Sequence, residues 1–280
     1  MATYFVISDV HGFYNEMIEA LDAAGYDINN KNHILISLGD LCDRGPDAKA
    51  CLEFINNIPE DNKVLILGNH EDLMEDAIKR GYFGNHDRHN MTDDTVYQCV
   101  NTTECQLKDD EQALCEMRFY EPWNKYISSC INYYETDKYV FVHSFIPTCN
   151  DSLIDILDLS DKEIFDWRNG DWYDARWGNP FELWQKGKNI TGKTIVCGHW
   201  HTSWAHSKIH HKGFEWNNPI FGLDNVACFD IFKDDGIIGI DACTAYSHKV
   251  NVFKIGNQKR IFENIPGQLS LFDKEELKDE

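Results

Sequence analysis

The sequence predicts an α/β protein with polar residues gathered at the carboxyl ends of its strands. Within residues 4–80, short apolar runs alternate three times with segments of helical periodicity, the order typical of a sheet covered by helices. Each apolar run is followed by a turn that combines Gly with Asp, Asn or His. Because the carboxyl ends of neighbouring parallel strands meet at one edge of a sheet, these turns predict a single functional site there.

Each of the three strand–helix units carries its own boundary signals. Gly25 follows the last apolar position of the first helix and is a suitable stop, and Pro46 stands near the start of the second helix. The run that ends at Leu38 is apolar along most of its length, so we expect a strand buried on both faces. In chain order, the predicted strands and helices are residues 4–8, 15–24, 33–38, 46–57, 64–67 and 72–79.

Beyond residue 80 the pattern is interrupted by two insertions. The first, about 81–135, is polar and is expected to form a helical cap, with helices around 93–101 and 109–118. The second, about 150–190, is rich in Trp, and we expect it to pack a small satellite core rather than to cap the site.

The remaining apolar runs complete the predicted sheet structure. Strands are expected at 138–142, 194–197, 227–232, 237–241 and 249–254, with the last three antiparallel. We expect one catalytic domain over residues 1–265 and an acidic C-terminal tail over residues 266–280.

Composition and charge exclude several classes of protein. The chain has 280 residues, 42% of them hydrophobic, so a large core is expected. The net charge of −21 argues against a general surface for nucleic acid or for an anionic membrane. No apolar run is long enough to span a membrane, and the N-terminal residues lead into a strand without the basic region of a signal peptide. The ten cysteines form no CxxC pair, so we expect reduced thiols and a cytoplasmic location.

Residues with metal-ligand chemistry follow five of the predicted strands. They are Asp9, His11, Asp40, Asn69, His143, His199 and His201. One such motif alone could be a turn or a helix cap, but all of them, in order and each after a strand, are hard to obtain by chance. Oxygen and imidazole ligands without a thiolate suit borderline or hard divalent ions, with Mn as first choice and Fe, Zn, Ni or Mg as alternatives.

The number of candidate ligands predicts two divalent ions rather than one, because a single ion with open positions cannot use them all. Asp9 and His11 are two residues apart and can chelate one ion from one side of a turn. Asp40 can reach both ions with its two carboxylate oxygens. Two ions about 3.5–4 Å apart can share a hydroxide nucleophile and hold phosphate oxygens.

The residues beside these ligands predict an acid catalyst and a phosphate contact. His70 points away from Asn69 if the segment is extended, so we predict that it acts as a general acid above the leaving group. Asp43 would orient His70, and Arg44 would make a bidentate contact with phosphate. The structural alternatives are a residue at a helix start for His70, a turn former for Asp43 and a salt bridge for Arg44.

The first three motifs resemble the signature blocks of one enzyme family. They are Ser8-Asp9-Val10-His11-Gly12, Gly39-Asp40-Leu41-Cys42-Asp43-Arg44-Gly45 and Gly68-Asn69-His70-Glu71. They look like those of the phosphoprotein phosphatase branch of the calcineurin-like metallophosphoesterases, with bacterial and phage phosphatases and symmetrical diadenosine tetraphosphatases as the nearer relatives. The resemblance is close over residues 4–80 and looser over 138–254. It implies a four-layer sandwich of two mixed β-sheets flanked by helices, with two metals at the strand ends.

The resemblance also implies a role for each residue. Asp9 and His11 would bind one metal, and Asn69, His143 and His199 would bind the other. Asp40 would bridge the two metals, His70 and Asp43 would form the acid pair, and Arg44 would hold phosphate.

Three departures from the family pattern matter. Ser8 stands where Gly is usual, and Ser144-Phe145 replaces a usual Gly-Gly after His143. His201 adds the second histidine of a broader GHxH block and is assigned to the first metal. A second phosphate-binding arginine is expected from the Trp-rich insertion, with Arg176 as first choice and Arg168 as the alternative.

The leading hypothesis is a dinuclear metal-dependent phosphoesterase in which a metal-bridging hydroxide attacks phosphorus and His70 protonates the leaving oxygen. The preferred substrate is a protein phosphorylated on Ser or Thr, with dual specificity for Tyr or a small aryl phosphate as variants. The alternative is a dinucleoside tetraphosphate or another nucleotide. A non-catalytic metal-binding scaffold is a rival, but it would not need His70, Asp43 and Arg44 together. A nuclease is disfavoured by the acidic charge.

Overall fold

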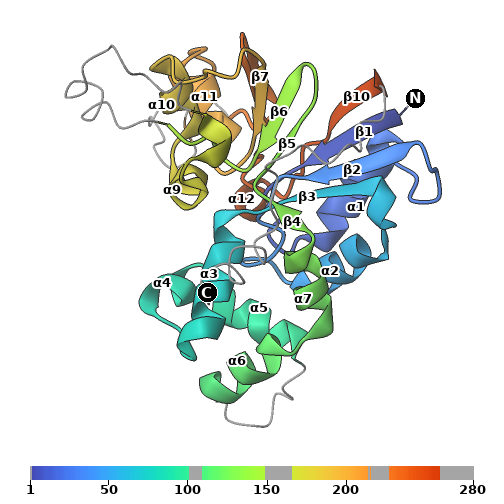
Figure 1. Cartoon of the computed structure of the whole chain (residues 1–280), viewed down its shortest axis with the longest axis vertical. Coiled ribbons are helices and arrows are strands. Elements are labelled where there is room, and N and C mark those ends of the chain that lie inside the picture. The colour runs from blue at the N-terminus through green and yellow to red at the C-terminus, as the bar shows by residue number, and fades with distance from the viewer. Residues whose placement is uncertain (1, 101–108, 149–165, 214, 216–226, 259–280) are drawn as a thin grey trace.

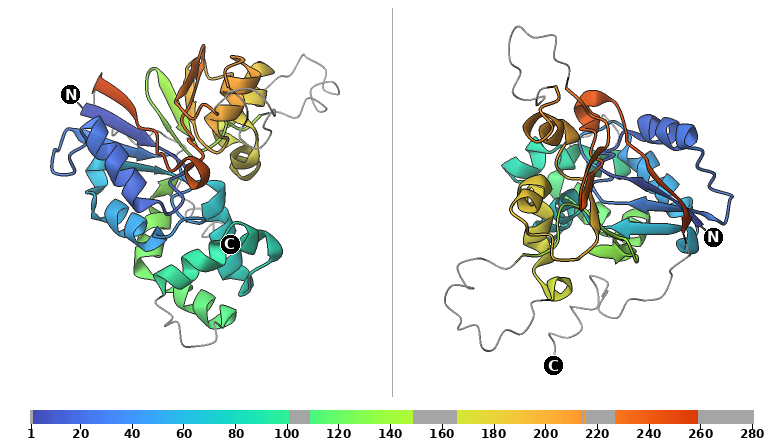
Figure 2. Two further views of the ribbon diagram at one scale, coloured as in Figure 1. Left: turned by 180° about the vertical axis from the view of Figure 1, so that it is seen from behind. Right: turned by 90° about the horizontal axis from the view of Figure 1, so that it is seen from above.

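The computed structural model of the chain describes residues 2–100, 109–148, 166–213, 215 and 227–258. Two β-sheets pack face to face, and helices cover the outer face of each sheet (Figure 1). The views from behind and from above show the same succession of helices, sheet, sheet and helices (Figure 2). The predicted α/β sandwich of two mixed sheets is therefore confirmed.

The first sheet holds the three strands predicted within residues 4–80. Its order is β10-β1-β2-β3-β4, in which β1 to β4 are parallel neighbours and β10 pairs with β1 in the antiparallel sense. The bounds are β1 (Ala2–Ile7), β2 (His33–Ser37), β3 (Lys63–Ile66), β4 (Cys130–Ile131) and β10 (Phe253–Gln258). The parallel register brings the carboxyl ends of β1, β2 and β3 to one edge, as the sequence predicted.

The second sheet is also mixed, with the order β5-β6-β7-β9-β8. β6, β7 and β9 are parallel, and the outer strands β5 and β8 are antiparallel to their neighbours. The bounds are β5 (Tyr133–Glu135), β6 (Tyr139–Val142), β7 (Thr194–Cys197), β8 (Phe232–Asp234) and β9 (Ile237–Gly239). β6 and β7 end at the residues before His143 and Gly198, so two predicted histidine motifs leave this sheet at one edge.

Alternation of side chains along the strands builds separate cores on the two faces of the first sheet. Phe5 and Ile7 of β1 lie in the core under the helices, whereas Tyr4 and Val6 lie in the core between the sheets. Each fully buried side chain of this kind stabilises the fold by about 1.5–3 kcal/mol. The strands are therefore apolar on both faces, which explains why they appear in the sequence as continuous apolar runs.

The helices fall into two groups, one on each outer face. α1, α2 and α7 lie over the first sheet, α3 to α6 continue this group of helices as a lobe below the sheet, and α9, α10 and α11 cover the second sheet (Figure 1). Their bounds are α1 (Tyr14–Ala24), α2 (Ala48–Asn57), η1 (Glu60–Asn62), α3 (Asn69–Arg80), α4 (Asn85–His89), α5 (Thr92–Cys99), α6 (Asp110–Arg118), α7 (Glu121–Ser128), η3 (Trp167–Asn169), α9 (Trp172–Trp177), α10 (Pro180–Gln185), α11 (Thr202–Lys208) and α12 (Thr244–Ser247). Gly25 ends α1 with a φ of 80°, so the predicted stop is confirmed.

The Trp-rich insertion packs a core where it is described. Trp167 and Trp172 are buried, and the Trp172 ring stacks on Tyr133 of β5 with centroids 5.2 Å apart. Residues 166–190 therefore share one core with strands of the second sheet, including Val140 and Ile195, and do not form a separate satellite core. Residues 150–165 of the predicted insertion and the predicted tail, 266–280, lie outside the described residues.

Two predictions for the C-terminal strands are wrong. No strand covers 227–231, and within this segment the Phe229 carbonyl accepts a hydrogen bond from the side chain of Asn251 (Nδ2, 2.7 Å). The strand predicted at 249–254 begins later, at Phe253, and belongs to the first sheet. Phe253 and Ile255 of β10 pack into the core between the sheets. Their burial stabilises β10 in its pairing with β1 at the edge of the first sheet.

Two further properties concern expectations from composition. The eight cysteines in the described part of the chain are free thiols. Among the same residues, no helix has both the length and the apolar character needed to cross a membrane.

Candidate metal centre and active site

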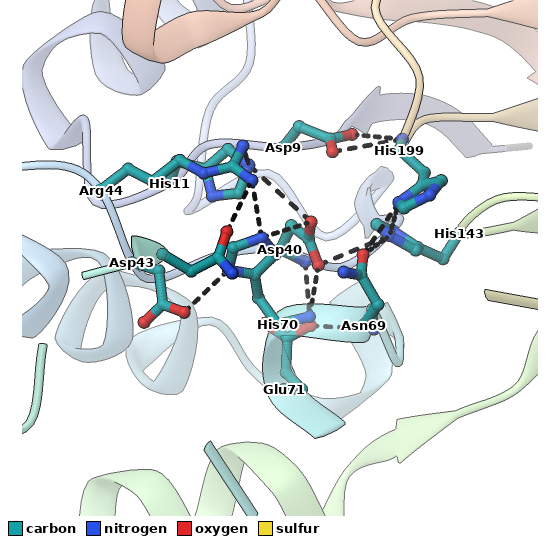
Figure 3. Close-up of polar contacts among 12 residues, drawn as sticks. Asp9, His11, Asp40, Asp43, Arg44, Asn69, His70, Glu71, His143 and His199 are labelled. Carbon is teal, nitrogen blue, oxygen red and sulfur yellow. Dashed lines mark hydrogen bonds and ion pairs between the residues drawn. The ribbon is translucent and has the colours of Figure 1, made fainter. Parts of the chain in front are cut away.

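Most of the predicted site residues lie close together in Figure 3, which labels them from Asp9 to His199. Many of them have an unusual backbone. The φ angle is positive at Asp9 (51°), His11 (53°), Asp40 (54°), Asp43 (69°), Arg44 (65°) and His199 (63°). A side-chain-bearing residue adopts this conformation at a cost on the order of 1–3 kcal/mol, so the surrounding structure holds these turns against strain.

Glycines allow the turns of the two sheets to approach each other closely. A Cβ atom at Gly198, just after β7, would lie 1.8 Å from Ser8 Oγ and 2.2 Å from Asp9 Oδ2. A Cβ atom at Gly68, just before α3, would lie 2.2 Å from Asp40 Oδ1. Glycine is therefore needed at both positions because any side chain would collide with site residues, and not because the turn needs a special backbone conformation.

One set of ligand atoms faces Oδ2 of Asp40. The Nε2 atoms of His11 and His70 each lie 3.8 Å from this oxygen. His11 donates its Nδ1–H to the Cys42 carbonyl (3.0 Å), and His70 donates its Nδ1–H to Asp43 Oδ2 (2.7 Å). Each ring therefore presents the lone pair of Nε2 to the centre.

A second set of ligand atoms faces Oδ1 of Asp40. His143 Nε2 lies 3.5 Å from this oxygen and 2.8 Å from Asn69 Oδ1. His199 Nδ1 lies 2.9 Å from Asn69 Oδ1 and 3.2 Å from His143 Nε2. Ligands bound about 2.1 Å from a tetrahedral ion are roughly 3.4 Å apart, so the three atoms have nearly the spacing of one coordination sphere.

The electrostatics of this second set fit a cation. His143 donates its Nδ1–H to the Leu38 carbonyl (2.8 Å), so its Nε2 lone pair faces the amide oxygen of Asn69. A proton on Nε2 would relieve that repulsion, but burial lowers the pKa of His143 well below its ordinary value. Burial also lowers the pKa of His199 to about 4. Neutral lone pairs that converge in a buried site are the arrangement that a divalent cation stabilises.

Buried carboxylates add to the case for a cation. Burial, and then the charges of Asp9 and Glu71, raise the pKa of Asp40 well above its usual value. Burial and the nearby Asp241 raise the pKa of Asp9 in the same way. Positive charge at the centre would favour the ionised form of both groups.

Arg44 supplies positive charge at one side of the centre. Its Nη1 donates to His11 Nε2 and its Nη2 to His70 Nε2, each at 2.9 Å. The same Nη2 also contacts Asn90 Oδ1 (3.2 Å). The guanidinium thus lies against the first set of lone pairs, at the exposed rim of the site.

Asp9 occupies the junction between the sheets. Its carboxylate accepts hydrogen bonds from the His199 backbone N–H (2.9 and 3.2 Å) and from the Ser8 hydroxyl. Asp241, which follows β9, lies close enough to raise the pKa of Asp9, and its own pKa is raised to about 6 by burial. Asp241 was not among the predicted site residues, although its position directly after an apolar run was a usable signal.

The segment that carries Asn69 and His70 is not extended, so the geometric reason given for His70 as an acid was wrong. α3 begins at Asn69, and successive side chains of a helix diverge by about 100°. His70 is nevertheless held in place by Asp43, whose pKa is raised by burial to about 7 although Thr92 and Thr95 donate hydrogen bonds to it. In this structure Nε2 of His70 accepts a hydrogen bond from Arg44 Nη2 (2.9 Å), so a cation or a leaving group at this atom would take the place of the guanidinium.

Glu71 has a role that the sequence did not indicate. Its buried carboxylate accepts the backbone N–H groups of Asp40 (2.9 Å), Leu41 (3.0 Å) and Gly68 (2.8 Å). It also accepts the hydroxyl of Tyr126 on α7 (3.1 Å). Glu71 therefore ties the turn after β2 to the turn after β3 and fixes the position of Asp40.

Neither ligand set includes Asp9, a predicted metal ligand, and three further predicted residues also lie outside both sets. Arg176 is buried and bonds Asp72 through two nitrogens (2.7 and 3.0 Å), and Arg168 pairs with Glu135. His201 belongs to neither set, and its Nδ1 lies 2.8 Å from the Ser203 hydroxyl. Phosphate binding by Arg176 and metal binding by His201 therefore remain predictions.

This arrangement of strand ends, carboxylate, amide and imidazole groups defines a candidate dinuclear metal centre in an α/β sandwich. The family model for the calcineurin-like phosphoesterases matches residues 2–242. The chain belongs to this family, whose members bind a dinuclear metal centre.

Similar proteins agree with the family at lower coverage. A symmetrical bis(5'-nucleosyl)-tetraphosphatase of Buchnera aphidicola is 39% identical over 71 residues, which are 25% of this chain and 24% of the relative. Serine/threonine-protein phosphatase 1 of Salmonella typhimurium is 34% identical over 73 residues, 26% of this chain and 32% of the relative. The chain thus spans about a quarter to a third of the length of these relatives.

The fold has a counterpart among solved structures. The cold-active protein-tyrosine phosphatase of a psychrophilic Shewanella superposes with a TM-score of 0.51 at 12% identity, covering 92% of this chain and 76% of that one. At this identity the likeness concerns the fold alone.

Proposed function

We propose that the protein is a dinuclear metal-dependent phosphoesterase. The observation that carries the proposal is the placement of Asp40, which turns each of its two oxygens toward a separate set of lone pairs. Asp9 and His11 are proposed ligands of one ion, with His201 as the further ligand predicted from sequence, and Asn69, His143 and His199 of the other. Carboxylate, amide and imidazole donors suit borderline or hard divalent ions, and Mn is the metal we propose, with Fe, Zn, Ni or Mg as alternatives.

The chain's own residues would bind the substrate and move the proton. When bound, the two ions would lower the pKa of water and neutralise phosphate charge. Arg44, at the exposed rim beside both histidines, is placed to hold phosphate oxygens with its forked donors. His70 would donate a proton from Nε2 to the leaving oxygen, and Asp43 would stabilise the charged imidazole through Nδ1.

The substrate proposal has two branches. A protein phosphorylated on Ser or Thr was preferred from the sequence, and the Salmonella relative carries such a name. A dinucleoside tetraphosphate is the second branch, and the Buchnera relative is named for it. Parallel assays with phosphopeptides and with diadenosine tetraphosphate separate the two branches, since each predicts turnover of one substrate and little of the other.

Activity on an artificial ester tests the proposal as a whole. Purified protein with Mn should hydrolyse p-nitrophenyl phosphate, and a chelator should abolish this activity until metal is restored. If no divalent ion supports turnover of any phosphate ester, the protein is a metal-binding scaffold instead.

His70→Asn tests the assignment of the acid. Turnover should fall by about 10²–10⁴-fold, the range that general acid catalysis supplies, while bound metal stays at the wild-type level. Metal analysis by mass spectrometry decides the matter. If His70→Asn loses metal, His70 is a ligand of the first ion and the acid must be sought elsewhere.

A further inference from the structure

Two threonines of the first insertion reach back to the carboxylate behind His70. Thr92 Oγ1 donates to Asp43 Oδ2 (2.8 Å), and Thr95 Oγ1 donates to Asp43 Oδ1 (2.8 Å). Both lie on α5, three residues apart, and so on the same face of the helix. The two threonines and Asp43 are all at most 1% exposed.

The contact with Thr95 fixes the backbone of Asp43 as well as its side chain. The Thr95 hydroxyl accepts the Asp43 backbone N–H (3.0 Å) while it donates its own proton to the carboxylate. Asp43 has a strained φ of 69°, so a two-point contact of this kind helps to hold a conformation that the turn alone would not favour.

Both carboxylate oxygens of Asp43 accept hydrogen bonds from side chains. Oδ1 receives Thr95, and Oδ2 receives Thr92 together with Nδ1–H of His70 (2.7 Å). With both oxygens engaged, the carboxylate is held in the orientation in which Oδ2 accepts Nδ1–H of His70. The imidazole plane follows, because Nδ1–H must point at that oxygen.

We propose that Thr92 and Thr95 are positioning residues for the reaction, which act through Asp43 to aim Nε2 of His70 at the leaving oxygen. The proposal rests on the phosphoesterase function proposed above. It makes α5 part of the catalytic apparatus rather than only a packing element of the first insertion. The neighbouring Asn90, also in the first insertion, accepts a hydrogen bond from Arg44 (3.2 Å). The first insertion therefore contacts both Asp43 and Arg44, which are adjacent in the chain.

The experiment compares two substrates that differ only in the leaving group. Phenyl phosphate releases a more basic phenolate than p-nitrophenyl phosphate, so it depends more on proton donation. For Thr95→Val, which keeps the shape but loses the hydroxyl, the ratio of kcat/KM for phenyl to p-nitrophenyl phosphate should fall about tenfold. Misplacing a catalytic group by about 1 Å can cost about 10²-fold, and we expect a smaller loss because Thr92 still bonds Asp43 Oδ2. Thr95→Ser keeps the hydroxyl and should restore most of the wild-type ratio. His70→Asn supplies the reference for complete loss of the acid.

Control variants separate an effect on the position of His70 from a general loss of stability. Thr136→Val removes a buried hydroxyl that bonds Tyr139 N–H (3.0 Å) in the second sheet, and it should lower stability without changing the ratio. If Thr95→Val does not fold, Thr92→Val, which loses one contact instead of two, is measured in its place. Bound metal is measured for every variant and should stay at the wild-type level.

The outcomes are distinct. An equal loss on both substrates, or a Thr95→Ser variant as impaired as Thr95→Val, would overturn the positioning role. An inactive wild-type enzyme would instead overturn the proposed phosphoesterase function. A His70→Asn variant with an unchanged ratio would remove the acid from the mechanism and the positioning role with it.

Discussion

The ion pair between Arg176 of α9 and Asp72 of α3 predicts a large loss of stability when it is broken. Arg176 Nε and Nη2 bond the two oxygens of Asp72 (2.7 and 3.0 Å), and Nη1 bonds Asn132 Oδ1 (3.0 Å). The side chains of Arg176 and Asp72 are 6% and 13% exposed. Burial raises the pKa of Asp72, and the guanidinium opposes that shift, so Asp72 depends on its partner.

Arg176→Met should therefore leave a buried carboxylate without its cation. Removing one partner of a buried pair costs about 3–5 kcal/mol, and we expect about 3 kcal/mol because water can still reach Asp72. In a domain of this size, that cost corresponds to a fall in Tm of roughly 6–12 °C. Met fills much of the space of the arginine stem, so a cavity adds little to the loss.

A double-variant cycle in urea denaturation checks the reasoning. Adding Asp72→Asn to Arg176→Met removes the stranded charge and should recover at least about 1 kcal/mol. A different result would contradict this: a loss of less than about 1 kcal/mol in the free energy of unfolding, together with a strong rise in KM. In that case the Arg176 guanidinium binds phosphate, as the sequence predicted, and the ion pair contributes little to stability.

Two more predictions concern the centre. Asp40→Asn should lower bound metal from about two ions to one or none per chain, because one oxygen is lost from a group that faces both ligand sets. Elemental analysis measures the bound metal, and retention of both ions would contradict the bridging role. Gly198→Ala should lower the free energy of unfolding by at least about 2 kcal/mol, because the added Cβ atom would clash with Ser8 and Asp9. The same variant should also bind less metal. Gly256→Ala, where a Cβ atom meets nothing within 4 Å, is the matched control and should show neither effect.

The parts of the fold that the sequence predicted are those set by local patterns. Strands buried on both faces appear as continuous apolar runs, and helices appear through their 3.6-residue period, so β1, β2 and β3 and the helices between them were placed within a few residues. The parallel order of these units then brought Asp9, Asp40 and Asn69 to one edge. No such pattern marks the short strands β4 and β5, which pair through only two or three residues each.

The parts that the sequence did not predict depend on contacts between distant segments. Glu71 looked like a residue that opens a helix, and its bonds to the turn after β2 exist only once the strands have paired. Thr92 and Thr95 bond a residue about fifty positions away, and neither periodicity nor motif spacing reports such a pairing. The start of α3 at Asn69 was missed because Gly68 and Asn69 are also common in turns, and the helix begins within the motif itself.

Strain and charge at the site have a common explanation in the packing of the two sheets. Asp9, His11, Asp40 and Asn69 come from the first sheet and its connections, whereas His143 and His199 follow strands of the second. The core between the sheets lies behind these turns, and its burial of side chains such as Tyr4 and Phe141 stabilises the face-to-face packing. That packing forces lone pairs and carboxylates together at the rim, where they repel one another without a cation. A bound cation would therefore add its binding free energy to the contact between the sheets, so the same groups would serve both chemistry and assembly of the fold.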